Sequence, residues 1–307
     1  SQALSETQKR MSRSFPTCFV ECVPGVTGVS VLRRAAGLAE SRLYVALRGV
    51  VGESCSPSAL AALRWLYTAV GSVAPRLEAI PLYEGWESRP LADRIDCAVA
   101  AQVPEAVGFE GAVLVRAAAV AGVATDAEAS TVHEAVAVGG TFDRLHAGHR
   151  LLLAASALVC RSRLYVGVAG DRLLANKPLA HLVEPFDVRA SNVVDFVARL
   201  KPTLDVRISS LVDPKAPPKA ATVEEISALV VSEETLPGAR QVAAMRRDAG
   251  ITTPLEFVVV GLVFARDKPD ASVADKLSSS HLRAADDGAA LAATTPTVVS
   301  HHHAAAV

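Results

Sequence analysis

The second half of the chain alternates apolar runs with helical stretches, and this alternation restricts the fold more than any other sequence feature. The expected strands span residues 135–138, 164–169, 204–208, 226–231 and 255–260, and the expected helices span 148–159, 186–200 and 235–248. Strands that are apolar along their whole length are typical of parallel sheets covered by helices on both faces. The pattern predicts an α/β fold, in which ligands bind beyond the carboxyl ends of the strands.

The chain is long enough for two domains. Residues 17–120 predict a smaller N-terminal α/β domain of unknown role, because apolar runs such as RLYVALRGVV alternate there with a Leu- and Ala-rich helix. An Ala-rich stretch over 121–134 predicts a linker to the main domain at 135–293. We expect a disordered tail over 1–16 and a flexible tail over 294–307.

The charge and cysteine content of the chain limit which partners it is expected to bind. The formal net charge is -1 and the pI about 6.7, so no general attraction to nucleic acid or membrane is expected. The five cysteines lack paired CxxC spacing and indicate reduced thiols rather than a zinc site. The longest clean apolar run, 257–265, is too short to span a bilayer. We expect a soluble, cytoplasmic protein. The sequence leaves open whether it associates with mitochondria and what its oligomeric state is.

The stretch Val136–Ala155, VAVGGTFDRLHAGHRLLLAA, carries the strongest chemical signal. Gly139 and Gly140 end the first expected strand of the main domain and let a phosphate approach the backbone closely. The following helix presents free N–H groups and a positive dipole end to the same space. His146 and His149 are three residues apart, so both can reach a triphosphate bound there. The stretch therefore predicts an anion site at the end of the strand.

A second cluster, KLSSSHLR, follows the last expected strand and precedes a helical segment. It contains three consecutive serines, Ser278, Ser279 and Ser280, with Lys276 before them and Arg283 after them. Helix capping explains one serine. Three serines with a cation at each end favour a second phosphate-binding site.

Five further polar residues follow strand ends or begin helices. Asp171 and Lys177 follow the strand at 164–169, and Arg189 begins a helix. Glu233 and Glu234 follow the strand at 226–231. Each has an alternative explanation: a solvated lysine, a surface arginine, or glutamates favoured by the helix dipole. From the residues alone, both readings stay open.

The stretch GGTFDRLHAGH resembles the signature of the nucleotidyltransferase superfamily, and KLSSSHLR resembles its second phosphate-binding motif. Together with VSEET and VGVAGDRLLANK, these motifs are similar to those of eukaryotic-type phosphopantetheine adenylyltransferases. The resemblance covers roughly residues 135–290. It implies a Rossmann-like parallel sheet in a nucleotidyltransferase domain, preceded by the smaller α/β domain.

By that resemblance the domain transfers the adenylyl group of ATP to 4'-phosphopantetheine, giving dephospho-coenzyme A and pyrophosphate, the penultimate step of coenzyme A biosynthesis. Gly140, Thr141 and Phe142 would line the cleft, and His146 and His149 would hold the triphosphate. The resemblance assigns further ATP- or acceptor-binding roles to Gly139, Asp143, Gly148, Asp171, Arg189, Glu233, Glu234 and Lys276.

The resemblance also gives Lys177 a catalytic role, beside the acceptor or the transferring phosphate. Ser278, Ser279 and Ser280, with Arg283, would hold the β- and γ-phosphates. It implies Mg²⁺ bound through the ATP phosphates with no separate protein metal site, and coenzyme A as a feedback ligand. No GxxxxGK[ST] motif occurs in the chain, so dephospho-coenzyme A is the expected product.

One segment departs from the family pattern. After VSEET, the aromatic, arginine and two glycines of eukaryotic members are replaced by LPGA over 236–239. We hypothesise that Arg240 or Arg246 replaces the missing cation. The alternatives are an FMN adenylyltransferase or a cytidylyltransferase on the same fold, and a non-catalytic nucleotide-binding scaffold. A class I aminoacyl-tRNA synthetase is disfavoured by the neutral charge of the chain.

Overall fold

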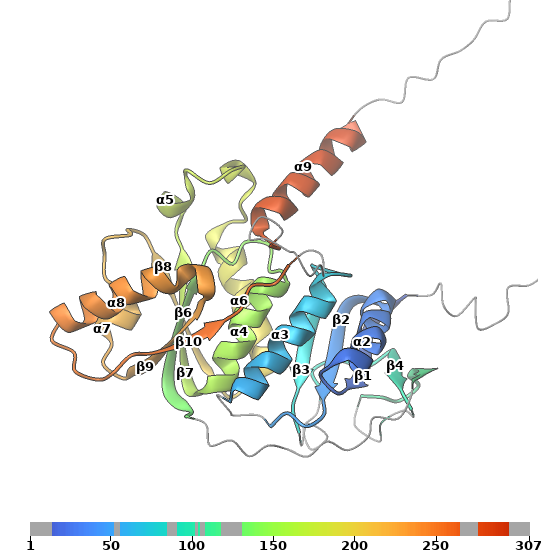
Figure 1. The fold of residues 1–307 in the computed structure, drawn as a ribbon. Coiled ribbons are helices and arrows are strands. Elements are labelled where there is room, and N and C mark those ends of the chain that lie inside the picture. The colour runs from blue at the N-terminus through green and yellow to red at the C-terminus, as the bar shows by residue number, and fades with distance from the viewer. Residues whose placement is uncertain are drawn as a thin grey trace, which may run out of the picture.

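The computed structural model describes residues 14–51, 56–84, 91–101, 104, 108–117, 131–264 and 276–294. These residues form two five-stranded sheets with their helices (Figure 1). Most of the expected tails and linker, together with Cys55, lies outside the described residues. The other four cysteines are buried free thiols. Among the described helices, none is both long and apolar enough to cross a membrane.

The first sheet belongs to the N-terminal domain. Its strands are β1 (Phe15–Cys22), β2 (Ala39–Leu47), β3 (Glu78–Leu82), β4 (Cys97–Ala100) and β5 (Val113–Arg116). They pair in parallel in the order β3-β2-β1-β4-β5. Two crossover helices, α2 (Val26–Leu38) and α3 (Pro57–Gly71), connect the first three strands. Helix α3 begins after Ser56, which caps it by accepting the Ala59 N–H at 3.2 Å and is followed by proline.

The second sheet forms the main domain. Its strands are β6 (His133–Gly140), β7 (Cys160–Ala169), β8 (Asp205–Leu211), β9 (Ile226–Ser232) and β10 (Glu256–Val260). Its helices are α4 (Ala147–Val159), α5 (Asp171–Leu174), η2 (Ala180–Leu182), α6 (Phe186–Leu200), α7 (Lys219–Thr222), η3 (Glu233–Thr235), α8 (Leu236–Asp248) and α9 (Ser279–Thr294). The strands pair in parallel in the order β10-β9-β6-β7-β8. The expected α/β class with parallel sheets is confirmed.

The two sheets have the same strand order. We number the strands of each sheet from its own first strand and read the second sheet from β8 to β10. Both sheets then have the order third, second, first, fourth, fifth. In each sheet the first strand is therefore central, and its carboxyl end leads into the first helix. Such a position, where neighbouring connections diverge, is where open parallel sheets bind ligands.

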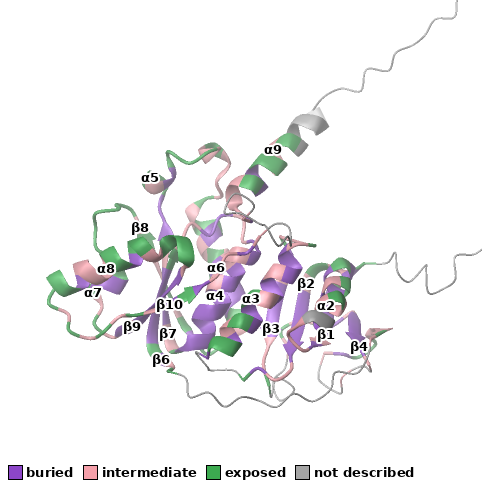
Figure 2. Cartoon of the chain, in the orientation of Figure 1, coloured by how far each residue is buried: buried purple, intermediate pink, exposed green. Residues whose placement is uncertain are grey.

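The two domains share one hydrophobic core. Helix α3 packs against α4, and β3 packs against α4 and α6 (Figures 1 and 2). The contact is close at the start of α4, where a Cβ added to Gly71 would lie 3.1 Å from the Cβ of Ala147. The Ala147 N–H also donates to the Pro75 carbonyl at 3.2 Å. The first sheet thus packs directly against the helix that follows β6.

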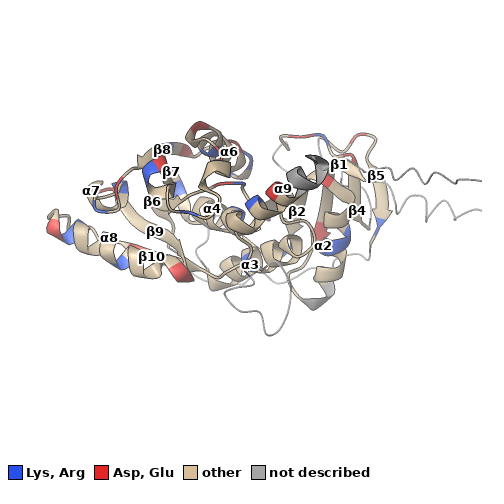
Figure 3. Cartoon of the chain, turned by 90° about the horizontal axis from the view of Figure 1, so that it is seen from above, with Lys and Arg blue, Asp and Glu red and all other residues tan. Residues whose placement is uncertain are grey.

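A second, smaller core lies between the second sheet and helices α7 and α8. Helix α8 carries three arginines, Arg240, Arg246 and Arg247, and one acidic residue, Asp248. Over the whole sequence 31 basic and 32 acidic residues nearly balance, and those of the described residues are spread over both domains (Figure 3). Helices therefore cover both faces of the second sheet, as its uniformly apolar strands predict.

Candidate active site

Gly139 and Gly140 end β6, and the loop that follows takes two left-handed backbone conformations before α4. Phe142 has a φ of 53° and Arg144 a φ of 47°, values that non-glycine residues rarely adopt. The loop folds the fully buried Phe142 ring under Gly140, where an added Cβ would lie 3.0 Å from the ring. Gly140 is therefore required by the close approach of this ring.

Helix α4 begins with an imidazole as its cap. Nδ1 of His146 accepts the N–H of Gly148 at 3.1 Å. An added Cβ at Gly148 would lie 3.1 Å from the same ring. The rings of His146 and His149 stack at 4.0 Å with 25° between their planes. Because Nδ1 of His146 is an acceptor, the neutral ring carries its proton on Nε2, which is free to donate to a ligand.

Both imidazoles are neutral at pH 7. Burial, reinforced by the Arg150 charge, lowers the pKa of His146 to about 3. Burial, followed by the His146 ring and then Arg150, also lowers the pKa of His149 well below its ordinary value. His149 keeps partial exposure, whereas His146 is only 5% exposed. The pair therefore offers N–H dipoles to an anion, and any positive charge must come from neighbouring side chains.

Asp143 joins the two phosphate-binding motifs. Its fully buried carboxylate forms an ion pair with Arg283, which is 1% exposed, and accepts the Glu184 N–H at 2.9 Å. Its carbonyl accepts the Ser279 hydroxyl at 2.8 Å. The carboxylate and the guanidinium thus satisfy each other, and they fix the start of α9 against the loop that follows β6.

The remaining groups of the second motif are also engaged. Arg283 donates to the Pro178 carbonyl and to the Ser280 hydroxyl, both at 2.9 Å. The Ser278 hydroxyl accepts the His281 N–H at 3.4 Å, as the capping explanation predicts. Lys276 pairs with Glu234, which lies in η3 after β9. This pair brings the end of β9 to the same place as the serine cluster.

Lys177 completes the set of cations at this edge of the sheet. Its ammonium donates to the Thr141 hydroxyl at 2.7 Å. Partial desolvation lowers the pKa of Lys177, with a smaller contribution from Arg283. The side chain is exposed, so a ligand can replace Thr141 as its partner. Lys177 therefore lies beside the loop between β6 and α4, and its charge also acts on His149.

Arg189 is fully buried, so the surface-cation explanation is wrong. It donates to three backbone carbonyls, those of Thr141 at 2.7 Å, Ala169 at 2.8 Å and Glu184 at 2.8 Å. These bonds connect the loop after β6 to the end of β7. Asp171 lies 3.8 Å from Arg189 with its carboxylate 90% exposed. Arg189 therefore positions the loop from within.

Arg246 does not replace the missing acceptor cation, and that part of the hypothesis is wrong. Its side chain is 2% exposed and donates to five backbone carbonyls, those of Ala220, Val223, Glu224, Ile226 and Thr253. Ile226 starts β9, so Arg246 lies at the opposite end of that strand from the motifs. Arg240 and Glu233 are exposed on the motif side, in α8 and η3.

A cavity of about 330 Å³ opens beside Gly139 and Gly167, on the face of the sheet that α8 covers. Its apolar lining includes Leu211, Val231 and Met245. Sequence reasoning missed this cavity, although the spacing of Val242 and Met245 along α8 was a usable signal. Within the described residues, no group of three or more His, Cys, Asp or Glu side chains could hold a metal ion.

A comparison with known families agrees with this geometry. Residues 137–285 match the family model described as cytidylyltransferase-like. That range includes the glycine turn, both histidines and the serine cluster. The second domain is therefore a nucleotidyltransferase domain of the cytidylyltransferase-like class.

Curated relatives narrow the class. The phosphopantetheine adenylyltransferase of Saccharomyces cerevisiae is 39% identical over 147 residues, 48% of this chain and 47% of that relative. Relatives of the same name from Pyrococcus abyssi and Thermococcus gammatolerans are 34% and 37% identical, and the matches cover 48% of this chain in each case and 88% and 87% of the relatives. The chain belongs to the phosphopantetheine adenylyltransferase family. It matches about half the length of the yeast relative and most of the archaeal ones.

Proposed function

We propose that this chain transfers the adenylyl group of ATP to 4'-phosphopantetheine, giving dephospho-coenzyme A and pyrophosphate. The observation that carries the proposal is the buried pair of Asp143 and Arg283, which holds the His-x-Gly-His loop and the serine cluster together. Both motifs therefore face the carboxyl ends of the strands, where a nucleotide triphosphate can contact them simultaneously. The family relationship supplies the acceptor.

The reaction needs no protein nucleophile. A phosphate oxygen of the acceptor attacks the α-phosphorus of ATP in line, and the bond from that phosphorus to the bridging oxygen breaks. Negative charge then increases on the departing pyrophosphate. Neutral His146 and His149 each have one ring N–H to donate to it, and the Lys177 ammonium balances its charge. We expect Mg²⁺ to accompany ATP, bound by the phosphate oxygens.

The apolar cavity beside Gly139 suits the pantetheine arm of the acceptor. Its volume of about 330 Å³ lies within the range of small-molecule sites. Gly139 lines the cavity, and Lys177 donates to the Thr141 hydroxyl two residues further along the chain, so we propose that the acceptor phosphate reaches this ammonium. Coenzyme A contains the same arm, and we propose it as a competing feedback ligand. We also propose a cytoplasmic location, where buried thiols stay reduced.

The test is pyrophosphate release by the purified chain. With ATP, Mg²⁺ and 4'-phosphopantetheine we expect steady turnover that needs all three. Parallel reactions replace the acceptor with FMN, or replace ATP with CTP, and both should be much slower. Turnover with FMN or with CTP but not with the proposed pair would identify a different transferase. Absence of turnover with every pair would support a non-catalytic nucleotide-binding scaffold.

A further inference from the structure

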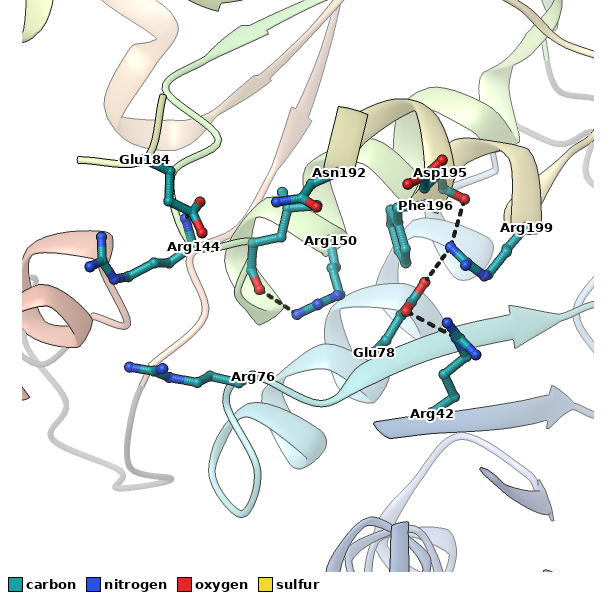
Figure 4. Close-up of a pocket in the computed structure, with 11 residues that line it drawn as sticks. Arg42, Arg76, Glu78, Arg144, Arg150, Glu184, Asn192, Asp195, Phe196 and Arg199 are labelled. Carbon is teal, nitrogen blue, oxygen red and sulfur yellow. Dashed lines mark hydrogen bonds and ion pairs between the residues drawn. The ribbon is translucent and has the colours of Figure 1, made fainter. Parts of the chain in front are cut away.

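A second cavity, of about 380 Å³, lies between the two domains, away from the apolar cavity. Five arginines line it: Arg42, Arg76, Arg144, Arg150 and Arg199. They come from both domains, from the first sheet and the segment before β3 and from the helices and loop of the main domain (Figure 4). Arg144 and Leu145 of the GGTFDRLHAGH motif line this cavity, whereas its two histidines do not.

Arginine dominates the lining of the cavity. Five guanidinium groups face it with three carboxylates, those of Glu78, Glu184 and Asp195. Glu78 is shared by two arginines, with Arg42 at 3.2 Å and Arg199 at 3.3 Å (Figure 4). Arg42 also pairs with Asp93 at 2.9 Å, outside the lining.

At the other end of the cavity, Arg76 and Arg144 both pair with Asp286 of α9. Arg144 also donates to the Leu182 carbonyl at 2.6 Å, and its own N–H binds the Glu184 carboxylate at 2.6 Å. Two guanidinium groups from different domains thus share one acceptor. A guanidinium has five N–H donors, so these pairs leave donors for a ligand.

Arg150 has no ion pair among the described residues. Its guanidinium donates to the Leu145 carbonyl at 2.6 Å and lies 5.7 Å from the centre of the Phe196 ring. The residue is 8% exposed, and its Nε is buried without a partner. Burial lowers the pKa of Arg150. A buried cation without a counter-ion is costly, and an anion in the cavity would offset that cost.

We propose that this cavity binds a small phosphate monoester. Such a group carries about −1.5 to −2 charges at pH 7 and would supply the counter-ion that Arg150 lacks among the described residues. Guanidinium groups recognise phosphate oxygens through paired N–H bonds. Phe196 and Leu145 offer apolar surface for the carbon part of the ester. The volume admits a small metabolite and excludes a macromolecular chain.

The ligand would contact both domains and the catalytic loop. Arg144 and Leu145 lie between Asp143 and His146 in the sequence. A phosphate monoester bound there therefore touches the back of the loop that presents the two imidazoles. Because binding favours the folded state in which the domains are packed together, it should raise the midpoint of thermal unfolding.

The experiment measures binding of glycerol 3-phosphate to the full chain by titration calorimetry, with inorganic phosphate as a second probe. Saturating non-hydrolysable ATP analogue fills the active site throughout, so catalysis plays no part in the readout. We expect binding to persist under these conditions. We expect Arg199→Met and Arg150→Met to weaken it about tenfold or more, and the matched control Arg247→Met, an exposed arginine of α8, to leave it unchanged.

Circular dichroism checks that each variant is folded, and Arg199→Met keeps the test decisive should Arg150→Met unfold. Three results would overturn the proposal. They are no binding to the wild-type chain, binding abolished by the ATP analogue, or binding unchanged in Arg199→Met. Because no result depends on turnover, failure of this proposal is distinguishable from failure of the proposed adenylyl transfer.

Discussion

The two sheets of this protein have the same strand order, yet their first strands lead into very different turns. In the first sheet, β1 runs through VPG into α2, whose start has no side-chain cap. A Cβ added at Gly28 in that helix would lie 2.2 Å from the carbonyl oxygen of Val23, so the backbone of the turn before α2 occupies the space beside its first turn. In the second sheet, His146 caps α4 and His149 stacks on it.

The comparison shows that strand order provides a place for a ligand and that side chains decide whether a site forms there. The motif cations of the second sheet come from two separate connections, because Lys177 follows β7 whereas Lys276 and Arg283 follow β10. The first sheet instead contributes packing, because α3 and the Pro75 carbonyl contact the start of α4. Four predictions test this division of roles.

The largest expected effect is on stability and belongs to the second sheet. Arg283→Met removes the fully buried partner of the Asp143 carboxylate, leaves only the pair with Arg144 at 3.2 Å, and should cost about 3–5 kcal/mol of unfolding free energy. In the first sheet, Arg42→Met removes two more exposed ion pairs, with Glu78 and Asp93, and should cost about 1 kcal/mol or less. Urea unfolding of both variants makes the comparison.

The double variant Asp143→Asn with Arg283→Met separates the pair from its surroundings. It should lose clearly less stability than the sum of the two single variants, because each single change leaves one buried charge without its buried partner. Additive losses would mean that the two side chains act independently, and the proposed connection between the motifs would be wrong.

The second prediction concerns the rate. His149→Ala should lower kcat by about 100- to 1000-fold, which corresponds to about 3–4 kcal/mol of transition-state stabilisation. His181→Ala, which removes an exposed imidazole of η2, is the matched control and should keep wild-type kcat. Steady-state pyrophosphate release measures both. Equal effects of the two substitutions would remove His149 from the mechanism.

The third prediction compares one glycine from each domain. Gly140→Ala places a methyl group about where an added Cβ meets the buried Phe142 ring at 3.0 Å, and should cost about 1–3 kcal/mol of stability. Gly37→Ala in α2 meets nothing within 4 Å and should gain up to about 1 kcal/mol. Thermal unfolding should therefore shift in opposite directions. A shared direction would show that the loop after β6 can relax.

The fourth prediction is the pH dependence of stability. An unfolded imidazole titrates near pH 6.5, whereas burial lowers the pKa of His146 to about 3 in the folded chain. Between these values the unfolded state binds more protons, so stability falls as pH drops, by about 1.4 kcal/mol per pH unit for this residue. His146→Asn should reduce that slope. The first sheet contributes no histidine to this slope, because the sequence has no histidine before His133.

Much of the second domain was predictable from the sequence because its signals are local. The helix expected at 186–200 has the same bounds as α6, and the glycine and histidine spacing predicts the turn into α4. Long-range pairing was not predictable. Asp143 and Arg283 lie 140 positions apart, and no local pattern shows that a buried carboxylate needs that arginine.

The buried arginines show the same limit. Arg189 and Arg246 look like surface cations in the sequence because arginine on a polar helix face is usually solvated. Each is buried because backbone carbonyls at loop and strand ends accept its donors. Those carbonyls become available only when the sheet forms. The equal strand order of the two sheets was likewise hidden, since pairing order is a property of the assembled fold.

The central claim is that the domain built on the second sheet transfers the adenylyl group of ATP to 4'-phosphopantetheine. Its most direct test follows radioactive phosphorus from ATP labelled at the α-position, with 4'-phosphopantetheine and Mg²⁺, into separated products. We expect the label in dephospho-coenzyme A, and label from γ-labelled ATP only in pyrophosphate. Label from the γ-position in the acceptor product, or α-label remaining entirely in nucleotide, would contradict the account.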